Sequence, residues 1–408
     1  MTPITETPVT ECGLVLAALD AAHATRKPKD WKERLAAFTD GDVTRELKAR
    51  PAFSAQRFLT LASPAAASRL EELANAAFRL TRQRFGNAVS LFAPLYLSNH
   101  CVNRCRYCGF NASQQHRRRR LSLAEALEEA RIIAAEGFRD ILLVSGEDRA
   151  HVNADYLCSL AEALRKDNLF SSVSVEINIL DQETYARLFA AGIDGVTVFQ
   201  ETYDRDSYDF WHGGGPKAVF ENRLNGQEFA AAAGMRRLGL GALLGLEDWR
   251  FDAYAMAVHA DTLARAYWRA KVSFSFPRIR PTEGGSERRF RHLVSDAELA
   301  QMLVALRLCF PDAGMTLSTR EPPGLRENLI PLGITQISAG SKTNPGGYSE
   351  HEAGESSTEQ FAVSDERGPA EMARILRTLG YDPVWKDWDA GFQGDRPAAT
   401  TNNTIAQN

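Results

Sequence analysis

The sequence predicts an α/β fold of the (β/α)8 TIM-barrel type, with an N-terminal helical extension and a C-terminal cap segment. Two observations predict it. Short runs rich in β-branched and aromatic residues alternate with longer helical patterns, and eight such runs can be counted. Alternating strands and helices favour a parallel sheet with helical crossovers, and eight such units close into a barrel. The expected strands cover residues 89–97, 140–145, 173–178, 195–200, 237–244, 272–276, 314–318 and 335–338.

Helical patterns fill both ends of the chain and the intervals between strands. Ser122 and Ser295 each precede a glutamate by three residues, which is the capping-box pattern of a helix start. Pro369 suits the first turn of a final helix. The residues after 393 are polar with little to bury, so we expect disorder there. The expected boundaries are 1–88 for the helical extension, 89–345 for the barrel, 346–393 for the C-terminal helix and cap segment, and 394–408 for the tail.

Composition excludes several classes of protein. The formal net charge is −4, so the chain as a whole has no strong attraction to nucleic acid or to an anionic membrane. The sequence lacks the run of about 18 apolar residues that a transmembrane helix needs. Its first residues lack the basic and apolar pattern of a secretory signal. We therefore expect a cytoplasmic protein with no nucleic-acid and no membrane partner.

Three cysteines lie close together directly after the first expected strand. Cys101, Cys105 and Cys108 form a C-x3-C-x2-C array. Cysteine thiolates hold iron–sulfur clusters, and three of them leave one iron of a [4Fe–4S] cluster open. The alternative is a structural zinc with His100 or His116 as the fourth ligand, but the second ligand pair typical of such sites is missing. The spacing favours the open cluster. The scattered cysteines, expected to be small apolar fillers, are Cys12, Cys158 and Cys309.

Glycines and polar residues follow the later strands, where a barrel collects its functional side chains. Each has an ordinary structural alternative. Gly146-Glu147 could be a plain turn, and the carboxylate of Glu176 inside an apolar strand could pair with an arginine. Arg320 could pair with Glu321, although adjacent residues on a strand point to opposite faces. The positions singled out at strand ends are Gly146, Glu147, Glu176, Glu201, Leu243, Gly245, Arg278, Arg280, Arg320 and Ser338.

The cysteine array, its place after the first strand and the aromatic Tyr107 before the third cysteine resemble the radical S-adenosylmethionine (SAM) superfamily. The resemblance implies that the open iron binds the methionine part of SAM and that reductive cleavage yields a 5′-deoxyadenosyl radical, chemistry that belongs to the cofactor. Gly146 and Glu147 would meet the methionine amino group, and Leu243 and Gly245 the adenine. The residues expected to bind the cofactor are Tyr107, Gly146, Glu147, Glu176, Glu201, Leu243, Gly245, Arg278 and Arg280.

A narrower resemblance runs from about residue 70 to residue 389. Segments 82–87, 95–99, 101–110, 200–203, 276–281, 317–320 and 384–389 are similar to the 2-iminoacetate synthases, the tyrosine lyases of bacterial thiamin thiazole biosynthesis. This family cleaves the Cα–Cβ bond of L-tyrosine to 2-iminoacetate and p-cresol, releasing 5′-deoxyadenosine and methionine. The resemblance implies that Tyr96, Arg320 and Ser338 hold the carboxylate and amine region of tyrosine. It also implies an electron donor such as flavodoxin and association with thiazole synthase.

Other functions remain open at the level of sequence. A tyrosine lyase of hydrogenase maturation would need cysteines for a second cluster, and no cysteine follows Cys309. A tryptophan lyase would share the barrel and the substrate anchor, but the Trp-Lys-Asp-Trp-Asp segment at 385–389 favours the thiazole enzyme. The third alternative is a zinc or iron–sulfur scaffold without catalytic activity. The basic run at 116–120 is typical of a solvated loop, and its place beside the cysteines would also suit an acidic electron donor.

Overall fold

The computed structural model describes residues 13–279, 290–349 and 359–386. Three sequence-based expectations fall outside these ranges: Cys12 as a filler, Arg280 as a cofactor ligand and the disordered tail at 394–408. Within the described ranges, no helix has both the length and the apolar composition needed to cross a membrane.

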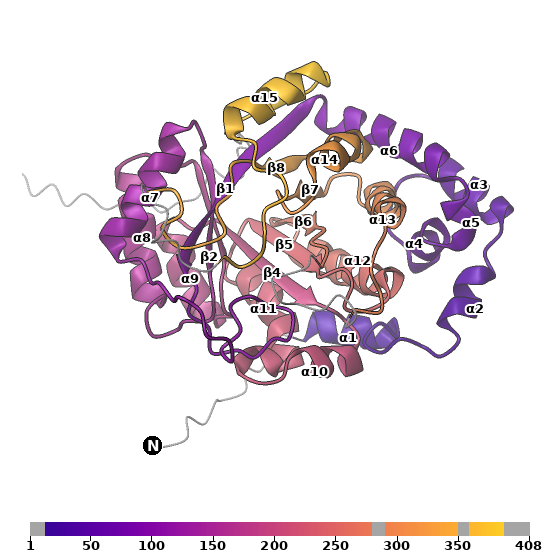
Figure 1. The fold of residues 1–408 in the computed structure, drawn as a ribbon. Helices are drawn as coiled ribbons and strands as arrows, with labels where there is room; N and C mark the ends of the chain where they lie inside the picture. The colour runs from indigo at the N-terminus through magenta and orange to yellow at the C-terminus, as the bar shows by residue number, and fades with distance from the viewer. Residues whose placement is uncertain (1–12, 280–289, 350–358, 387–408) are drawn as a thin grey trace, which may run out of the picture.

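Eight parallel strands close into a barrel, as the sequence predicts (Figure 1). The sheet runs in sequence order from β2 to β8, continues to β1, and closes where β1 pairs with β2. The expected strands agree with the observed ones to within two residues at each end. The strands are β1 (Ala88–Ser98), β2 (Asp140–Ser145), β3 (Ser172–Glu176), β4 (Gly195–Glu201), β5 (Arg237–Ala242), β6 (Lys271–Ser275), β7 (Gly314–Leu317) and β8 (Gln336–Ser338).

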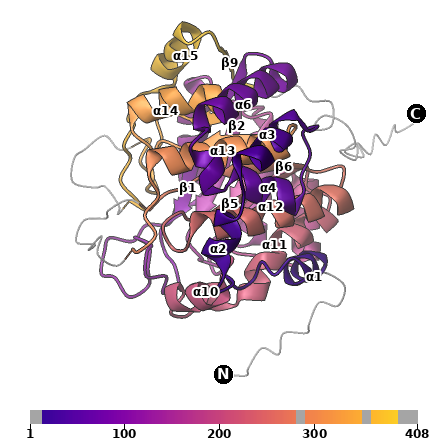
Figure 2. The ribbon, with the colours of Figure 1, turned by 90° about the vertical axis from the view of Figure 1, so that its right-hand side faces the viewer.

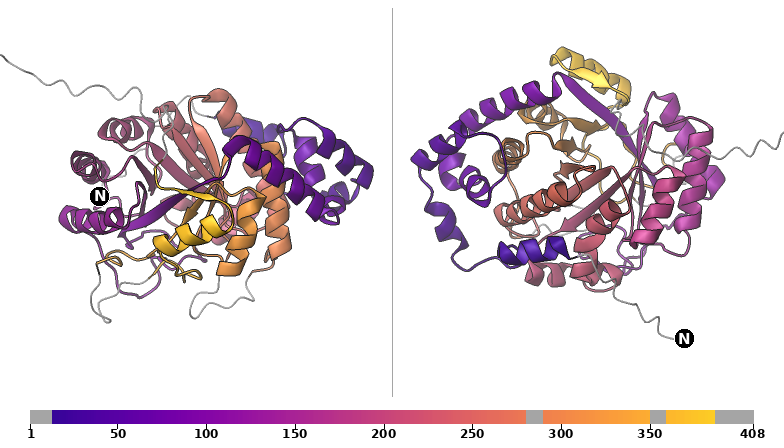
Figure 3. Two further views of the ribbon diagram at one scale, coloured as in Figure 1. Left: turned by 90° about the horizontal axis from the view of Figure 1, so that it is seen from above. Right: turned by 180° about the vertical axis from the view of Figure 1, so that it is seen from behind.

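Helices follow the strands and surround the barrel, which Figure 3 shows from above and from behind. Ser122 and Ser295 cap two of them with the expected reciprocal bonds to the third residue of the helix. The helices are α7 (Leu123–Ala135), α8 (Ala154–Lys166), α9 (Gln182–Ala191), α10 (Arg205–Trp211), η1 (Pro216–Ala218), α11 (Phe220–Ala232), α12 (Trp249–Ala266), α13 (Asp296–Cys309), α14 (Pro323–Leu329) and η3 (Ile330–Leu332).

The two ends of the chain cover the outside of the barrel. Among the N-terminal helices, α6 packs along α13 and α1 along α12. At the other end, Pro369 starts the last helix as expected, and the strand after it extends the sheet beside β1 (Figure 2). The elements are α1 (Leu14–Ala21), α2 (Trp31–Ala36), α3 (Asp40–Lys48), α4 (Ala55–Leu61), α5 (Pro64–Ala67), α6 (Leu70–Phe85), α15 (Pro369–Thr378) and β9 (Asp382–Val384).

The inside of the barrel carries polar as well as apolar side chains. Side chains alternate between the two faces of a strand, and inward positions such as Ser174 on β3 and Ser273 on β6 carry hydroxyl groups that line a cavity. At the N-terminal end of the strands, Asp140 accepts hydrogen bonds from Arg237 at 2.7 Å and from Gln336 at 3.1 Å. Barrels of this type usually pack apolar side chains there. This chain instead places the hydrogen-bonded carboxylate of Asp140 there.

Candidate active site

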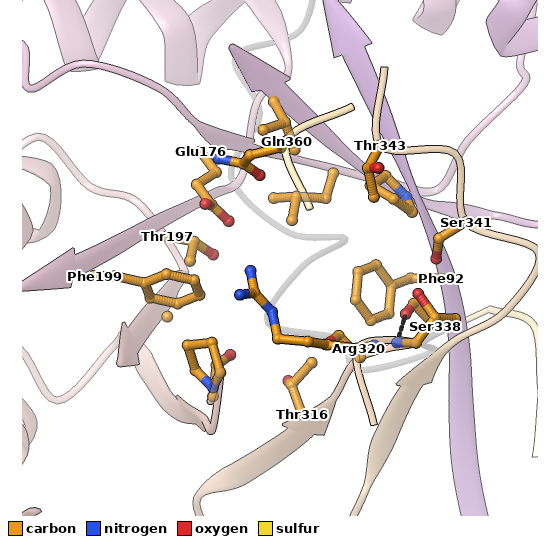
Figure 4. A pocket seen from close by; sticks show the side chains of 18 of the residues that line it. Phe92, Glu176, Thr197, Phe199, Thr316, Arg320, Ser338, Ser341, Thr343 and Gln360 are labelled. Atoms are coloured by element: carbon orange, nitrogen blue, oxygen red, sulfur yellow. Dashed lines mark hydrogen bonds between the residues drawn. The ribbon is translucent and has the colours of Figure 1, made fainter. Parts of the chain in front are cut away.

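A large cavity occupies the barrel and opens among the loops at its C-terminal end. Its empty space amounts to about 1500 Å³, including the part open to solvent. Typical small-molecule sites measure roughly 300–1,000 Å³, so the cavity has room for more than one small ligand. Figure 4 shows polar and aromatic side chains pointing into it. The sequence-predicted site residues that line it are Tyr96, Tyr107, Cys108, Glu176, Glu201, Leu243, Arg320 and Ser338.

The three-cysteine loop lies beside this cavity. Backbone and side-chain N–H groups point at the sulfur atoms: Phe110 N donates to Cys108 Sγ at 3.4 Å, and Asn103 Nδ2 to Cys101 Sγ at 3.6 Å. Burial and the neighbouring Cys105 raise the pKa of the Cys108 thiol to about 12. A thiol in such surroundings becomes a thiolate when a metal binds it. The donors and the buried sulfur fit an iron–sulfur cluster.

The zinc alternative would require several ligands to converge on one ion. Nowhere in the described parts of the chain do three cysteine, histidine or acidic side chains form such a group. A cluster makes a different demand, because each cysteine binds a different iron. The three cysteines are therefore candidate ligands for three different irons of one cluster.

The end of β2 packs closely against the cysteine loop. A Cβ atom on Gly146 would lie 2.2 Å from the carbonyl oxygen of His100, so only glycine fits there. The buried carboxylate of Glu147 accepts a hydrogen bond from Asn103 at 2.7 Å and pairs with Arg149 at 2.8 Å. The structure thus brings Gly146 and Glu147 against the cysteine loop, and their contact with the methionine amino group of SAM stays a prediction.

Two arginines of the basic run at 116–120 form hydrogen bonds with other parts of the protein. The guanidinium of Arg118 donates to the carbonyl groups of Asn99, Phe110 and Asn111. Arg120 forms two hydrogen bonds with the buried Asp148, at 2.7 and 2.8 Å. The interpretation of the whole run as a solvated loop was therefore wrong, because Arg118 and Arg120 fix the fold of the cysteine loop.

A second wall of the cysteine loop comes from residues 211–217, which the sequence analysis did not single out. Tyr107 shares a hydrogen bond of 2.8 Å with Nε2 of His212, whose other ring nitrogen lies 2.8 Å from the carbonyl oxygen of Tyr208. A Cβ on Gly215 would lie 2.5 Å from the side-chain oxygen of Asn103. Three consecutive glycines at 213–215 were the available signal, because glycine lets two backbones approach closely.

Glu201, at the end of β4, points into the cavity from a strained backbone. Its φ is +72°, in the left-handed region that side-chain-bearing residues rarely adopt. The carboxylate pairs with Lys217 at 2.6 Å. Burial by itself would raise the pKa of Glu201, but the cations Lys217 and Arg223 outweigh it and lower the pKa. Glu201 therefore stays ionised at neutral pH and can accept hydrogen bonds.

The residues predicted to bind the cofactor after β5 and β6 have different surroundings. Leu243 lines the cavity, and Gly245, at φ +119°, packs against Ile279. Arg278 differs from the expectation that it binds the cofactor. Its guanidinium pairs with the buried Glu321 and, at 2.8 Å, with Asp296. The arginine ties the end of β6 to that of β7, and its side chain is occupied.

Arg320 places a positive charge on the cavity wall away from the cysteine loop. Its guanidinium stacks on the ring of Phe361, with Cζ 3.6 Å from the ring centre, and Nε is buried without a hydrogen-bond partner. No ion pair to Arg320 occurs within the described ranges, and Glu321 pairs with Arg278 instead. An unpaired buried guanidinium needs an anionic ligand, and a carboxylate matches its planar fork.

Two neighbours complete this side of the cavity. The Ser338 hydroxyl accepts the backbone N–H of Thr319 at 3.1 Å and keeps its own proton to donate (Figure 4). The Tyr96 hydroxyl donates to Oε1 of Gln360 at 2.7 Å. Gln360 and Phe361, which cover the cavity from the C-terminal segment, were not predicted as site residues. Gln360 contacts Tyr96, which lies 264 residues away along the chain, so no local pattern in the sequence could indicate its position.

Comparison with family models defines the class of protein. Residues 95–255 match the radical SAM superfamily, and residues 275–382 match the Biotin and Thiamin Synthesis associated domain. The first match contains the cysteine loop and the ends of β2 to β5. The fold, the cysteine loop and this match define a radical SAM enzyme, a class that uses a [4Fe–4S] cluster and SAM.

Individual relatives narrow the class. The chain is 43% identical to 2-iminoacetate synthase of Escherichia coli (strain K12) over 365 residues, 88% of this chain and 95% of that protein. Identity to 2-iminoacetate synthase of Salmonella typhimurium (strain LT2) is also 43%, over 88% and 94% of the two chains. The chain belongs to the 2-iminoacetate synthase family.

Solved structures agree with this fold. HydG, a maturase of the [FeFe]-hydrogenase, superimposes with a TM-score of 0.83 at 33% identity, covering 90% of this chain and 81% of that one. Methylornithine synthase (PylB) has a TM-score of 0.67 at 19% identity and covers 84% and 96%, a likeness in fold alone.

Proposed function

We propose that this chain is a radical SAM lyase that cleaves the Cα–Cβ bond of L-tyrosine to 2-iminoacetate and p-cresol, releasing 5′-deoxyadenosine and methionine, for thiamin thiazole biosynthesis. One observation carries the proposal beyond family membership. A single cavity joins Cys108 of the cysteine loop to the unpaired guanidinium of Arg320. A cofactor at the first and an amino acid at the second would therefore meet in the same enclosed space.

The cofactor would be held at the cysteine side. Cys101, Cys105 and Cys108 would ligate the [4Fe–4S] cluster, whose open iron and bound SAM supply the radical that takes a hydrogen from the substrate. Glu147 offers its buried carboxylate to the methionine amino group, since carboxylates form strong hydrogen bonds with ammonium groups. Glu201 offers ionised oxygens to the ribose hydroxyls. The sequence left open whether Arg278 or Arg280 meets the SAM carboxylate; Arg278 is occupied by two acids, and Arg280 lies outside the described residues.

The substrate would be held at the opposite side. Arg320 binds the tyrosine carboxylate through its fork, and Ser338 donates its free hydroxyl proton to the same group. Tyr96 borders the amine region. Phe361 stacks on Arg320 and shields it from water, which strengthens its attraction for a carboxylate. Fixed placement matters most in this reaction, because a primary radical attacks the hydrogen that lies nearest.

The same proposal includes two protein partners, an electron donor and thiazole synthase, and a cellular compartment. A reductant must reach the cluster, and the exposed Val102 with the neighbouring exposed side chains of Arg104 and Arg106 offers a basic face at the cysteine loop to an acidic donor such as flavodoxin. Thiazole synthase would receive the unstable product. The described cysteines form no disulfide bonds, which suits a reducing compartment such as the cytoplasm.

The likeness to HydG supports a second candidate, a hydrogenase-maturation lyase. Anaerobic turnover of the reconstituted enzyme with SAM, a reductant and either tyrosine or tryptophan separates the candidates. We expect p-cresol and 5′-deoxyadenosine from tyrosine and little product from tryptophan. Carbon monoxide and cyanide formed in step with p-cresol would assign the chain to the maturation lyases. Methylindole-type products from tryptophan would assign it to the tryptophan lyases.

A further inference from the structure

Two opposite charges face each other across the cavity without touching. Figure 4 shows the carboxylate of Glu176, at the end of β3, and the guanidinium of Arg320 pointing toward the centre of the cavity from different strands. Each influences the pKa of the other electrostatically. No ion pair joins them, and within the described ranges the carboxylate of Glu176 forms no hydrogen bond. The space between an unpaired anion and an unpaired cation suits a ligand that carries both charges.

Glu176 also lies where the two halves of the site meet. Some of the charged and titratable groups near Glu176 lie toward the cysteine loop, and the others lie toward Arg320. The resemblance to the tyrosine lyases implies that the radical takes a hydrogen from the amino group of tyrosine, so this nitrogen has to lie at the boundary between cofactor and substrate. The charged and titratable groups that face Glu176 are Glu201, Lys217 and Arg223 on the cysteine side, and Arg320 and Tyr96 on the substrate side.

The energetics of Glu176 point to a cationic ligand. Burial, together with the neighbouring Glu201, raises its pKa to about 7, although three nearby cations act in the opposite direction. Taking a carboxylate out of water without a partner is costly. Lys217 does not relieve this cost, because its ammonium pairs with Glu201 at 2.6 Å. An incoming ammonium group would supply the missing partner, and it would favour the ionised form of Glu176.

We propose that Glu176 binds the α-ammonium group of the tyrosine substrate while Arg320 binds its carboxylate. The two side chains together recognise the zwitterion and direct the amino nitrogen toward the cofactor. This inference rests on the proposed function. The sequence predicts that Glu176 binds the cofactor, whereas the inference assigns it to the substrate. It also explains a charge within β3 whose other inward residue, Ser174, is a small hydroxyl.

The test compares two ligands that differ only in the amino group, L-tyrosine and 3-(4-hydroxyphenyl)propanoate. Their dissociation constants are measured anaerobically by calorimetry on the cluster-reconstituted enzyme with SAM present. The wild type should prefer tyrosine by about tenfold or more, as a charge-assisted contact does. Glu176→Gln should reduce this preference to within about threefold and leave the affinities for the propanoate and for SAM unchanged. Ser174→Ala, a change on the same face of β3, should keep the full preference.

Three results would overturn the inference. The first is a Glu176→Gln variant that keeps its preference for tyrosine. The second is a variant whose SAM affinity falls while the preference stays, which would return Glu176 to the cofactor. The third is a wild type that binds both ligands equally. Tyrosine failing to bind at all while SAM binds would overturn the proposed function itself, and the inference with it.

The wild type alone provides a second measurement, should the substitution impair folding or iron content. A carboxyl with a pKa of about 7 is mostly neutral at pH 6 and mostly ionised at pH 8. Only the ionised form attracts an ammonium group, so the preference for tyrosine over the propanoate should rise about tenfold between these pH values. A preference that stays constant over this range would contradict the assignment.

Discussion

Replacing Arg320 with lysine tests the substrate anchor most sharply. The guanidinium is buried, its Nε has no partner, and Phe361 stacks on it at 3.6 Å. One terminal nitrogen donates a long hydrogen bond, 3.4 Å, to the carbonyl oxygen of Arg278, so most of the donors of the guanidinium are available to a carboxylate. Lysine keeps the charge but loses the planar fork and the stacking. A charge-assisted hydrogen bond contributes about 1.5–3 kcal/mol, so losing one of the two should cost about 2–3 kcal/mol. At about 1.4 kcal/mol per factor of ten, tyrosine should bind about 30- to 150-fold more weakly.

The assay is anaerobic calorimetry with tyrosine and with tyramine, which lacks the carboxylate. Arg320→Lys should weaken tyrosine alone and leave tyramine and SAM within about twofold of the wild type. Arg374→Lys makes the same replacement at a side chain that is 70% exposed, and it should change nothing. The reasoning is refuted if Arg320→Lys binds tyrosine as the wild type does, or if tyramine loses as much affinity as tyrosine.

Three further changes probe the cofactor side and the cover of the cavity. Cys108→Ala should abolish iron incorporation on anaerobic reconstitution, whereas Cys309→Ala should keep the full iron and sulfide content; stoichiometric zinc without iron in the wild type would contradict this. Gly146→Ala forces a Cβ to within 2.2 Å of a backbone oxygen and should lower iron content and SAM affinity, whereas Gly324→Ala, with nothing within 4 Å, should match the wild type in both. Asp365→Ala removes the acidic partner of Arg326, whose side chain is fully buried. The free energy of unfolding, measured with denaturant, should fall by about 3–5 kcal/mol, and a fall of less than about 1 kcal/mol would contradict that prediction.

The sequence predicted the barrel because its signals are local. Buried strands show apolar residues at alternate positions, and helix starts such as Ser122 and Ser295 carry their capping partners three residues away. The cysteine array and the Gly146-Glu147 turn are local as well. Each of these features could therefore be read without knowing which distant segments meet.

The remaining features depend on distant contacts. Arg278 follows a strand as a ligand would, but its partner Glu321 lies 43 residues further along the chain, so the sequence could not show that its side chain is occupied. The pairing of Tyr107 with His212 and the cover formed by Gln360 arise in the same way, from segments that only the fold brings together. The polar side chains that β3 contributes to the barrel interior did have a local signal, the alternating Ser-Val-Ser-Val-Glu of this strand.

The central claim is that one enclosed site couples hydrogen abstraction to a single cleavage of tyrosine. A single-turnover reaction under anaerobic conditions tests it most directly, with enzyme in excess over tyrosine, with SAM and reductant present, and with all products quantified. We expect p-cresol, 5′-deoxyadenosine and glyoxylate, the last from hydrolysis of 2-iminoacetate, in a ratio of about 1:1:1, as fixed placement of the reacting groups requires. Abundant 5′-deoxyadenosine without p-cresol, or carbon monoxide in place of glyoxylate, would contradict the account.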